Sequence, residues 1–486
     1  MANETNTYVA IFQALTNIPH GQRQESFPVH QASLNQTPRF YPHLAAWHFK
    51  YGRIRDHNVS FAAALCLADY EQERNVGLAL LREMNPRQVV QVLQLIDSTK
   101  NQVSDGRFYN VPRSVRTEIA RYLREREATP VWWDKAVLSA REAMKQLYIS
   151  LHIAPDARAQ LYLFDDDPQD GVLSVIKMLP TMSDPLTQAK VIVDWEIPWP
   201  IATSVVKTIT PEIMIALVNS MTPAQVLSNM KSLKTIGALD NPDLKAMIQS
   251  KIKKSGKDKR VTSGRMEVAV REGGLDQEFT EIVRDAEDQN IKGGLRITKP
   301  TGICIDISGS QRETIEFGKL LLSTIVPAMG DETASYQYAF NDVGDEIKIN
   351  ERTVRGVEMA MRGVEPNGMT AYGIPIRAMK TRKQIVEQIV FIGDEGENKP
   401  PAFENEIREY ITQTGVTPAI IMVRIGNVSE TVIENVCRKL KIEFHAITYD
   451  GDEYTLQQVA NLLSAPSLAD LVMKIMDFPL PIRRVS

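Results

Sequence analysis

Five oxygen-bearing side chains in the second half of the sequence have the types and the spacing of a metal site. Asp306, Ser308 and Ser310 follow one apolar run within a single short loop. Thr370 and Asp394 come later, and Asp394 follows a second apolar run. Ligands of open α/β sheets bind at the carboxyl ends of strands. We therefore expect these five side chains to gather at one edge of a sheet.

The donor chemistry of this set favours a hard divalent cation, because all five donors are oxygens and none is His or Cys. A carboxylate beside buried strands is also costly unless a charge compensates it. The small ligand charge favours Mg²⁺ over Ca²⁺, and Mn²⁺ could substitute. The alternative is that Asp306 and Asp394 cap the helices that follow, while the serines form turn hydrogen bonds. Thr370 and Asp394 follow in the expected order after the expected elements, and this favours a metal site over helix capping.

Apolar runs alternate with helical segments beyond about residue 285, which predicts a parallel, doubly wound α/β sheet. The predicted strands are 302–307, 334–340, 388–392, 419–423 and 442–447. Over residues 298–480 the five-residue pattern resembles the metal-ion-dependent adhesion site (MIDAS) of von Willebrand factor A domains, with Met369 where a glycine usually precedes the threonine. The resemblance implies a von Willebrand factor A domain over residues 286–486, with one open metal position for a partner's carboxylate.

The first 285 residues are predicted to form an all-α domain of short stacked helices, because apolar side chains recur there at three- and four-residue spacing. Several helices begin with a capping residue followed by proline, a pair that suits the first helical turn. Such short helices must pack on their neighbours, as in HEAT arrays. The starts are Asn85-Pro86, Asp184-Pro185, Thr210-Pro211, Thr222-Pro223 and Asn241-Pro242.

Four segments of this half are similar to the TROVE domain of Ro ribonucleoproteins: 111–122, 140–152, 195–200 and 210–233. In that family, as here, a helical array precedes an A domain. The resemblance implies a ring-shaped array that binds structured or misfolded small noncoding RNA, including Y-RNA-like molecules, and takes a single-stranded RNA end through a basic hole. It implies a binding protein without catalytic residues, and we expect no enzymatic activity.

Eight basic side chains are the candidates for RNA contact, and His152 occupies the position of an RNA-contacting histidine in the Ro family. The alternative for each is a solvated helix face on which Glu118, Glu125 and Glu127 pair with the arginines. The paired tryptophans Trp132 and Trp133 could stack on bases, although burial in the core is the commoner role. The eight candidates are Arg113, Arg116, Arg121, Arg124, Lys135, Arg141, Lys145 and His152.

A formal net charge of −4 excludes a protein that coats nucleic acid through its overall charge, so an RNA site must be a local patch and no DNA partner is expected. The basic run 251–260 is equally suited to phosphate contact and to a surface linker. Three scattered cysteines and the absence of a signal-peptide pattern or long apolar stretch predict a cytoplasmic protein without a membrane partner. The rival function is a protein-interaction scaffold that acts through the metal.

Overall fold

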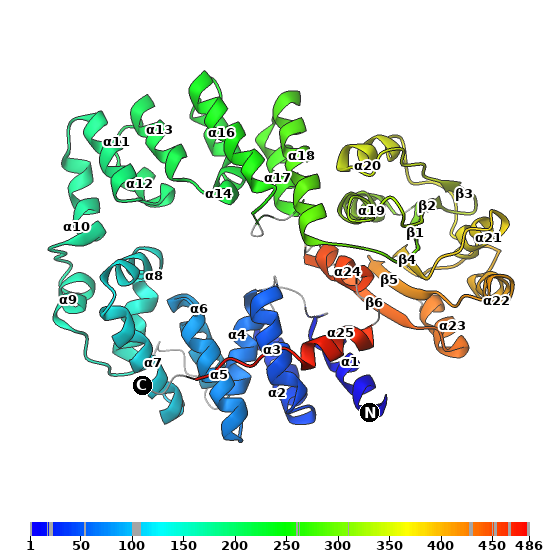
Figure 1. The fold of residues 1–486 in the computed structure, drawn as a ribbon, viewed down its shortest axis with the longest axis horizontal. Helices are drawn as coiled ribbons and strands as arrows, with labels where there is room; N and C mark the ends of the chain where they lie inside the picture. The colour runs from blue at the N-terminus through cyan, green and yellow to red at the C-terminus, as the bar shows by residue number, and fades with distance from the viewer. Residues whose placement is uncertain are drawn as a thin grey trace. The chain divides into compact units, whose positions relative to one another are not determined.

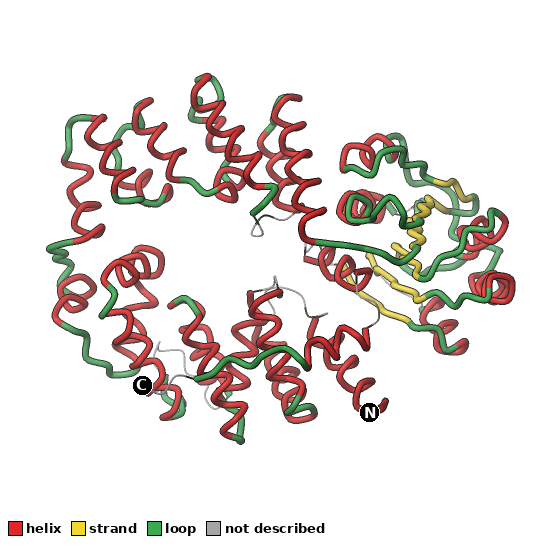
Figure 2. Tube along the Cα trace, in the orientation of Figure 1, coloured by secondary structure: helices red, strands yellow, loops and turns green. Residues whose placement is uncertain are grey.

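The chain forms two compact units in the computed structural model: Met1–Met221 with Ala469–Ser486, and Thr222–Leu468. The model describes residues 2–16, 18, 23–52, 55–99, 108–258, 261, 263–309, 311–426, 431–449, 451, 454–464 and 468–483. Helices make up the first unit, and the strands all lie in the second (Figures 1 and 2). Ser310 and residues 259–260 of the basic run lie outside the described residues.

The first unit is built from short helices and one short closing helix from the end of the chain. Their bounds are α1 (Ala2–Thr16), α2 (Arg23–Gln36), α3 (Phe40–Tyr51), α4 (Arg55–Cys66), α5 (Glu71–Glu83), α6 (Pro86–Ser98), α7 (Arg113–Glu127), α8 (Pro130–Ser150), α9 (Ala157–Ala159), the π-helix η1 (Gln160–Phe164), α10 (Gly171–Met178), the 3₁₀-helix η2 (Leu179–Thr181), α11 (Pro185–Asp194), α12 (Trp199–Val205), α13 (Pro211–Ser220) and α25 (Leu468–Met476).

These helices stack in two rows, as predicted for a HEAT-like array. Helices α2, α4, α6 and α8 pack in series, and α3, α5 and α7 form a second row against them. The predicted stripe of Val89, Leu93 and Ile96 is fully buried between the rows. Helices α1 to α3 belong to the same unit.

The five predicted capping residues all cap helices. Each accepts a hydrogen bond at its side-chain oxygen from a backbone N–H of the first turn. Asn85 and Thr222 form complete capping boxes with the glutamines three residues later. Proline follows each cap, where its missing N–H leaves no helical bond unmade.

The end of the chain returns to the first unit. His43 Nδ1 lies 2.6 Å from the carbonyl oxygen of Phe478. The guanidinium of Arg483 donates to Asn75 at 3.0 Å and to the buried carboxylate of Glu118 at 2.7 Å. The C-terminal segment is therefore part of the packing of the first unit.

The second unit contains the last helices of the array and the α/β domain. Its elements are α14 (Pro223–Ser228), α15 (Met230–Thr235), α16 (Pro242–Ser255), α17 (Ser263–Gly273), α18 (Gln277–Gly294), β1 (Thr301–Asp306), α19 (Arg312–Ile325), β2 (Ser335–Phe340), β3 (Gly344–Glu346), α20 (Val354–Ala360), α21 (Gly373–Thr381), β4 (Gln388–Gly393), α22 (Phe403–Thr414), β5 (Ala419–Ile425), α23 (Val432–Leu440), β6 (Phe444–Tyr449) and α24 (Tyr454–Ser464).

The sheet has the order β3-β2-β1-β4-β5-β6. All five predicted strands are present and pair in parallel, while the short edge strand β3, which was not predicted, pairs antiparallel to β2. From β1 the chain extends the sheet first toward β3 and then, from β4, toward β6. The direction of winding therefore reverses between β1 and β4, and such a switch point is where open α/β sheets bind ligands.

Two apolar cores cover the two faces of this sheet, so its central strands are buried on both sides. Alternate side chains of β1 show the division: Ile303 and Ile305 belong to the core beneath α19, α20 and α24, and Cys304 belongs to the core beneath α21, α22 and α23. All three cysteines are buried and free, as expected for cysteine used as a small apolar residue.

A buried arginine joins the end of the helical array to the α/β domain within the second unit. Arg284 of α18 pairs with Glu287 at 2.9 Å, with Glu267 of α17 at 2.6 Å and with Glu358 of α20 at 2.5 Å. Asp288 of α18 also accepts the N–H of Val354 at the start of α20. Helix α18 continues to Gly294, and these contacts group residues on both sides of the predicted boundary at 285 into one unit.

Among the described residues, no single helix is both long enough and apolar enough to cross a membrane; one bent pair, Gln458–Ser464 with Ala469–Met476, has the length and composition to do so. Closure of the helical array into a ring stays a prediction.

Candidate functional site

Asp306 ends β1 at the switch point of the sheet, and its carboxylate is completely buried. Its Oδ1 accepts the N–H of Ser308 at 2.8 Å. Its Oδ2 is buried without a hydrogen-bond partner among the described residues. Burial, and to a smaller extent the negative charge of Asp394, raises the pKa of Asp306 to about 7. A buried carboxylate oxygen left in this state lacks either a proton or a cation.

Asp394 follows β4, the neighbouring strand, so both aspartates lie at the same sheet edge. Its Oδ1 accepts the N–H of Gly396 at 2.9 Å, and its Oδ2 accepts a hydrogen bond from Gln311 Nε2 at 2.7 Å. Gln311 is itself buried at the start of α19. The side chain of Gln311 therefore holds the loop after β4 against the loop after β1.

The loop that carries Thr370 is tied to the loop after β1 by two backbone hydrogen bonds. Asn367 N–H donates to Ile307 O at 2.7 Å, and Gly309 N–H donates to Gly368 O at 3.3 Å. Gly368 has a φ of +75°, and a Cβ there would lie 2.7 Å from side-chain atoms of the neighbouring loop, so glycine is required. Thr370 is buried beside this turn.

The structure thus brings four of the five predicted metal ligands to one edge: Asp306, Ser308, Thr370 and Asp394. Ser310 lies outside the described residues. In the described part of the chain, no group of three or more His, Cys, Asp or Glu side chains has the arrangement of a metal site. A cation at this edge would therefore depend on hydroxyl and water oxygens as well as on the two aspartates, which is the ligand set that Mg²⁺ accepts.

A buried ion pair that the sequence did not suggest supports the loop after β4. Glu395, next to Asp394, is fully buried with a φ of +62°. Arg424 of β5 donates to Glu395 Oε2 at 2.7 Å and to Glu434 of α23 at 2.7 Å. Burial raises the pKa of Glu395, and the Arg424 guanidinium opposes that shift. Neither this pair nor Gln311 had a signal in the sequence, because each depends on contacts between distant segments.

The eight basic candidates lie on α7, on α8 and just after α8 in the first unit. The segment 111–152 contains eight Arg and Lys residues against five Asp and Glu residues, a local positive excess in a chain of net charge −4. Arg113, Arg124, Lys135 and His152 are exposed, and the other four are half-buried. His152 has a φ of +53° at the end of α8.

Several of these basic groups already have partners within the first unit. Arg121 pairs with Glu118 at 3.6 Å and Arg124 with Glu127 at 2.5 Å, as the alternative of a paired helix face predicts. Arg116 donates to the carbonyl oxygen of Val111 at 3.2 Å.

The next two have partners outside α7. Lys135 pairs with Glu196 at 3.5 Å. Arg141 donates to Asp166 and to the carbonyl oxygen of Tyr162 at 2.8 and 2.9 Å.

The tryptophan pair belongs mainly to the core. Trp133 is 1% exposed, which confirms burial in the core for that residue. Trp132 is half-buried beneath the guanidinium of Arg126, which lies 3.9 Å from its ring centroid.

Comparison with known proteins identifies the fold of the whole chain. The structure matches the Ro (RSR) protein of Deinococcus radiodurans over 92% of this chain and 94% of that protein, with a TM-score of 0.63 and 12% sequence identity. No family model and no curated protein matches the sequence. At this identity the match shows the fold: a Ro-type helical array followed by a von Willebrand factor A domain.

Two further matches each cover part of the chain. A von Willebrand factor type A protein of Catenulispora acidiphila is 14% identical, with a TM-score of 0.28 over 37% of this chain and 43% of that one. Proximal thread matrix protein 1 of the mussel byssus, in a form with a zinc-occupied MIDAS motif, is 13% identical, with a TM-score of 0.24 over 38% of this chain and 48% of that one.

Proposed function

We propose that this chain, which has the fold of a Ro protein, binds structured small noncoding RNA and captures a single-stranded RNA end. The observation that carries the proposal is the match to a Ro protein over nearly the full length of both chains. The local excess of basic residues on α7 and α8 supports it, because phosphate contacts supply most of the affinity for RNA. The mechanism is capture without chemical turnover, in the cytoplasm.

The side chains best placed to meet phosphates are those without internal partners. Arg113, Lys145 and His152 have no hydrogen-bond or ion-pair partner for their side chains among the described residues, and two of them are exposed. Arg116, Arg121, Arg124, Lys135 and Arg141 stay in the proposed site, but each must exchange an existing contact for an RNA phosphate.

The first test is the affinity for a small hairpin RNA with a single-stranded 3′ tail, measured by fluorescence anisotropy at 50 and 200 mM salt. We expect submicromolar binding at low salt that weakens at high salt and survives EDTA. The double variant Lys145→Ala, His152→Ala should bind at least several-fold more weakly. Lys190→Ala, an exposed lysine on α11 outside the site, is the matched control.

No binding at low salt would overturn the RNA proposal and favour the protein scaffold. If the double variant and the wild type bind the RNA equally, Lys145 and His152 do not belong to the RNA site.

We also propose that the sheet edge of the second unit holds a divalent cation, with Mg²⁺ favoured over Mn²⁺ and Ca²⁺. The unpartnered Oδ2 of Asp306 supports this proposal, since a cation would compensate a buried charge. Asp306, Ser308, Thr370 and Asp394 would hold it, with Ser310 completing the set by sequence. A bound cation would act as a Lewis acid toward a carboxylate of a protein partner, while Gln311 orients Asp394. Isothermal titration with Mg²⁺ tests it: we expect binding heat for the wild type and none for Asp306→Asn, and no heat for the wild type, or equal heat for the two proteins, would contradict the proposal.

A further inference from the structure

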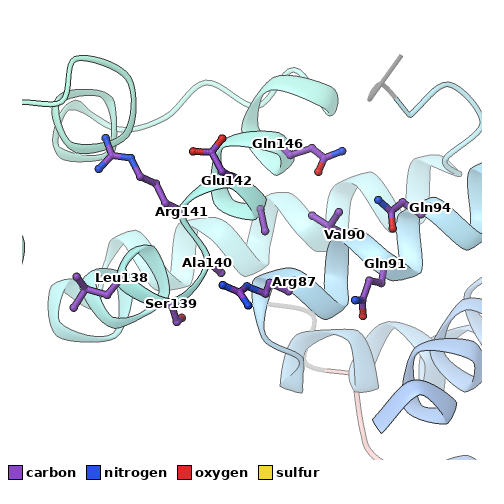
Figure 3. A pocket seen from close by; sticks show the side chains of 11 residues that line it. Arg87, Val90, Gln91, Gln94, Leu138, Ser139, Ala140, Arg141, Glu142 and Gln146 are labelled. Atoms are coloured by element: carbon purple, nitrogen blue, oxygen red, sulfur yellow. The ribbon is translucent and has the colours of Figure 1, made fainter. Parts of the chain in front are cut away.

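A cavity of about 530 Å³ lies between α6 and α8 of the first unit. Helix α8 is interrupted beside it: Ala140 has a φ of −153° and a ψ of 43°, outside the helical range. The residues before and after this break, Ser139 and Arg141, both line the cavity (Figure 3). The break therefore lies at the wall of the cavity between two packed helices.

The walls of the cavity combine apolar surface with neutral hydrogen-bonding groups. Val90 and Ala140 are buried on the apolar side. The polar lining includes the side-chain amides of Gln91, Gln94 and Gln146. Each of these amides offers both donors and an acceptor. This is the chemistry of a site for a flat, neutral group with polar edges.

Charge at the cavity comes mainly from two opposite groups. Arg87 is exposed and reaches toward Ala140 in Figure 3, and it has no ion-pair partner in the described part of the chain. Glu142 is the one carboxylate of the lining. The guanidinium of Arg141 points away from the glutamines toward Asp166, with which it pairs at 2.8 Å. A purely anionic ligand would meet Glu142, so phosphate alone does not explain the lining.

We propose that this cavity holds one unpaired base of a bound RNA. The volume lies within the range of small-ligand sites, roughly 300–1,000 Å³. An unpaired base presents apolar faces for Val90 and Ala140 and hydrogen-bonding edges for the glutamine amides. The guanidinium of Arg87 would stack on the base or meet its phosphate. This inference rests on the proposed RNA binding and adds that the protein reads a base.

The test compares two RNAs that differ only in the bases of the tail. One hairpin carries a single-stranded 3′ tail of uridines, and the other carries the same tail with abasic sites. We expect the wild type to bind the uridine tail on the order of 10-fold more tightly, the effect of one stacked and hydrogen-bonded base. The double variant Gln91→Ala, Gln146→Ala should bind the two RNAs equally.

Three further variants separate the cavity from the rest of the surface. Ala143→Leu keeps the polar groups and fills the cavity, so it should also abolish the preference for bases. Gln169→Ala, an exposed amide outside the lining, and Arg39→Ala, an exposed arginine in the turn before α3, should retain the preference. Tryptophan fluorescence checks that every variant is folded.

Equal affinity of the wild type for the two tails, or a preserved preference in both the double variant and Ala143→Leu, would overturn the base site and leave RNA binding intact. Absence of binding to either hairpin would overturn RNA binding together with it. Uridine monophosphate is the third probe: tighter binding of this mononucleotide than of the tailed RNA would make the cavity a site for free nucleotides and would also overturn the proposal.

Discussion

Replacing Asp306 by asparagine should stabilise the metal-free protein at alkaline pH. The folded environment raises the pKa of Asp306 from the ordinary 3.8 to about 7, mainly through burial. The unfolded chain therefore releases this proton at lower pH than the folded chain, and stability falls as the pH rises between the two values. A difference of about three pKa units corresponds to about 4 kcal/mol. Asparagine keeps the acceptor for the Ser308 N–H and carries no charge.

At pH 8 with EDTA we expect Asp306→Asn to exceed the wild type in stability by up to about 4 kcal/mol. At pH 5 the difference should fall to less than about 2 kcal/mol, because the carboxyl is then protonated in the fold and only the unfolded chain has released its proton. Mg²⁺ at 100 times its dissociation constant should stabilise the wild type by about 2.7 kcal/mol and leave the variant unchanged.

The assay must report on the second unit alone. All five tryptophans lie before residue 200, in the first unit, so tryptophan fluorescence does not follow this site. Hydrogen exchange of peptides from β1 and β4, with calorimetry for the global transition, is the appropriate measurement. Greater stability of the metal-free wild type at pH 8, or equal protection of both proteins by Mg²⁺, would refute the assignment of a buried, charged Asp306 as a metal ligand.

Three other substitutions test the packing of the two units. Arg284→Met should lower the free energy of unfolding of the second unit by about 3–5 kcal/mol, measured by calorimetry. The substitution leaves buried carboxylates without the guanidinium that pairs with them. The loss should be smaller at pH 6 than at pH 8, since burial raises the pKa of Glu287 to about 7 and the proton removes its charge at the lower pH. Asn85→Ala removes the capping box of α6 and should cost about 1 kcal/mol, measured by tryptophan fluorescence in denaturant. Arg483→Ala removes one cation beside the fully buried Glu118 and should cost the first unit about 1–3 kcal/mol in the same assay.

Each of these substitutions has a matched control. Arg355→Ala removes an exposed ion pair to Glu281, so a cost above about 1 kcal/mol would undermine the argument from burial. Asn85→Asp retains a side-chain acceptor and should retain the helix start. Ile482→Ala, at a side chain 88% exposed, should leave stability unchanged; a loss as large as that of Arg483→Ala would show that the backbone of the tail, and not the ion pair, provides the stabilisation.

Local patterns were sufficient to predict five helix starts and the five parallel strands. The five predicted helix starts, each a capping residue followed by proline, all cap helices. The central strands are apolar on both faces, so they stand out as continuous runs. The aspartate at the end of β1 and the one after the end of β4 could be assigned to one edge because parallel strands share their carboxyl ends.

Features that depend on long-range contacts had no such signal. The return of Arg483 to Glu118 and the bond from Gln311 to Asp394 join residues far apart in the sequence. The break at Ala140 has no proline or glycine to mark it, so the cavity beside it could not be predicted. The division of the chain near residue 221 also follows from contacts, such as those of Arg284, that no local pattern encodes.

The ion pairs on α7 and α8 also determine how strongly salt should act on RNA binding. Seven of the eight candidates are Arg or Lys, and contact of all seven with phosphates would give a slope of log affinity against log salt of about −5. Among the described residues, Arg113, Lys145 and Arg87 are the arginines and lysines of α6, α7 and α8 whose side chains have neither an ion-pair nor a hydrogen-bond partner.

Three contacts give a slope of about −2. We expect the shallower slope, measured by anisotropy from 50 to 300 mM salt. An arginine that already pairs with Glu118 or Glu127 would exchange a carboxylate for a phosphate, so its contact with RNA adds little binding free energy. A slope near −5 would show that the RNA displaces these pairs. A slope near −2 with submicromolar affinity requires that contacts other than phosphate contacts contribute to binding, and the α6–α8 cavity would supply one.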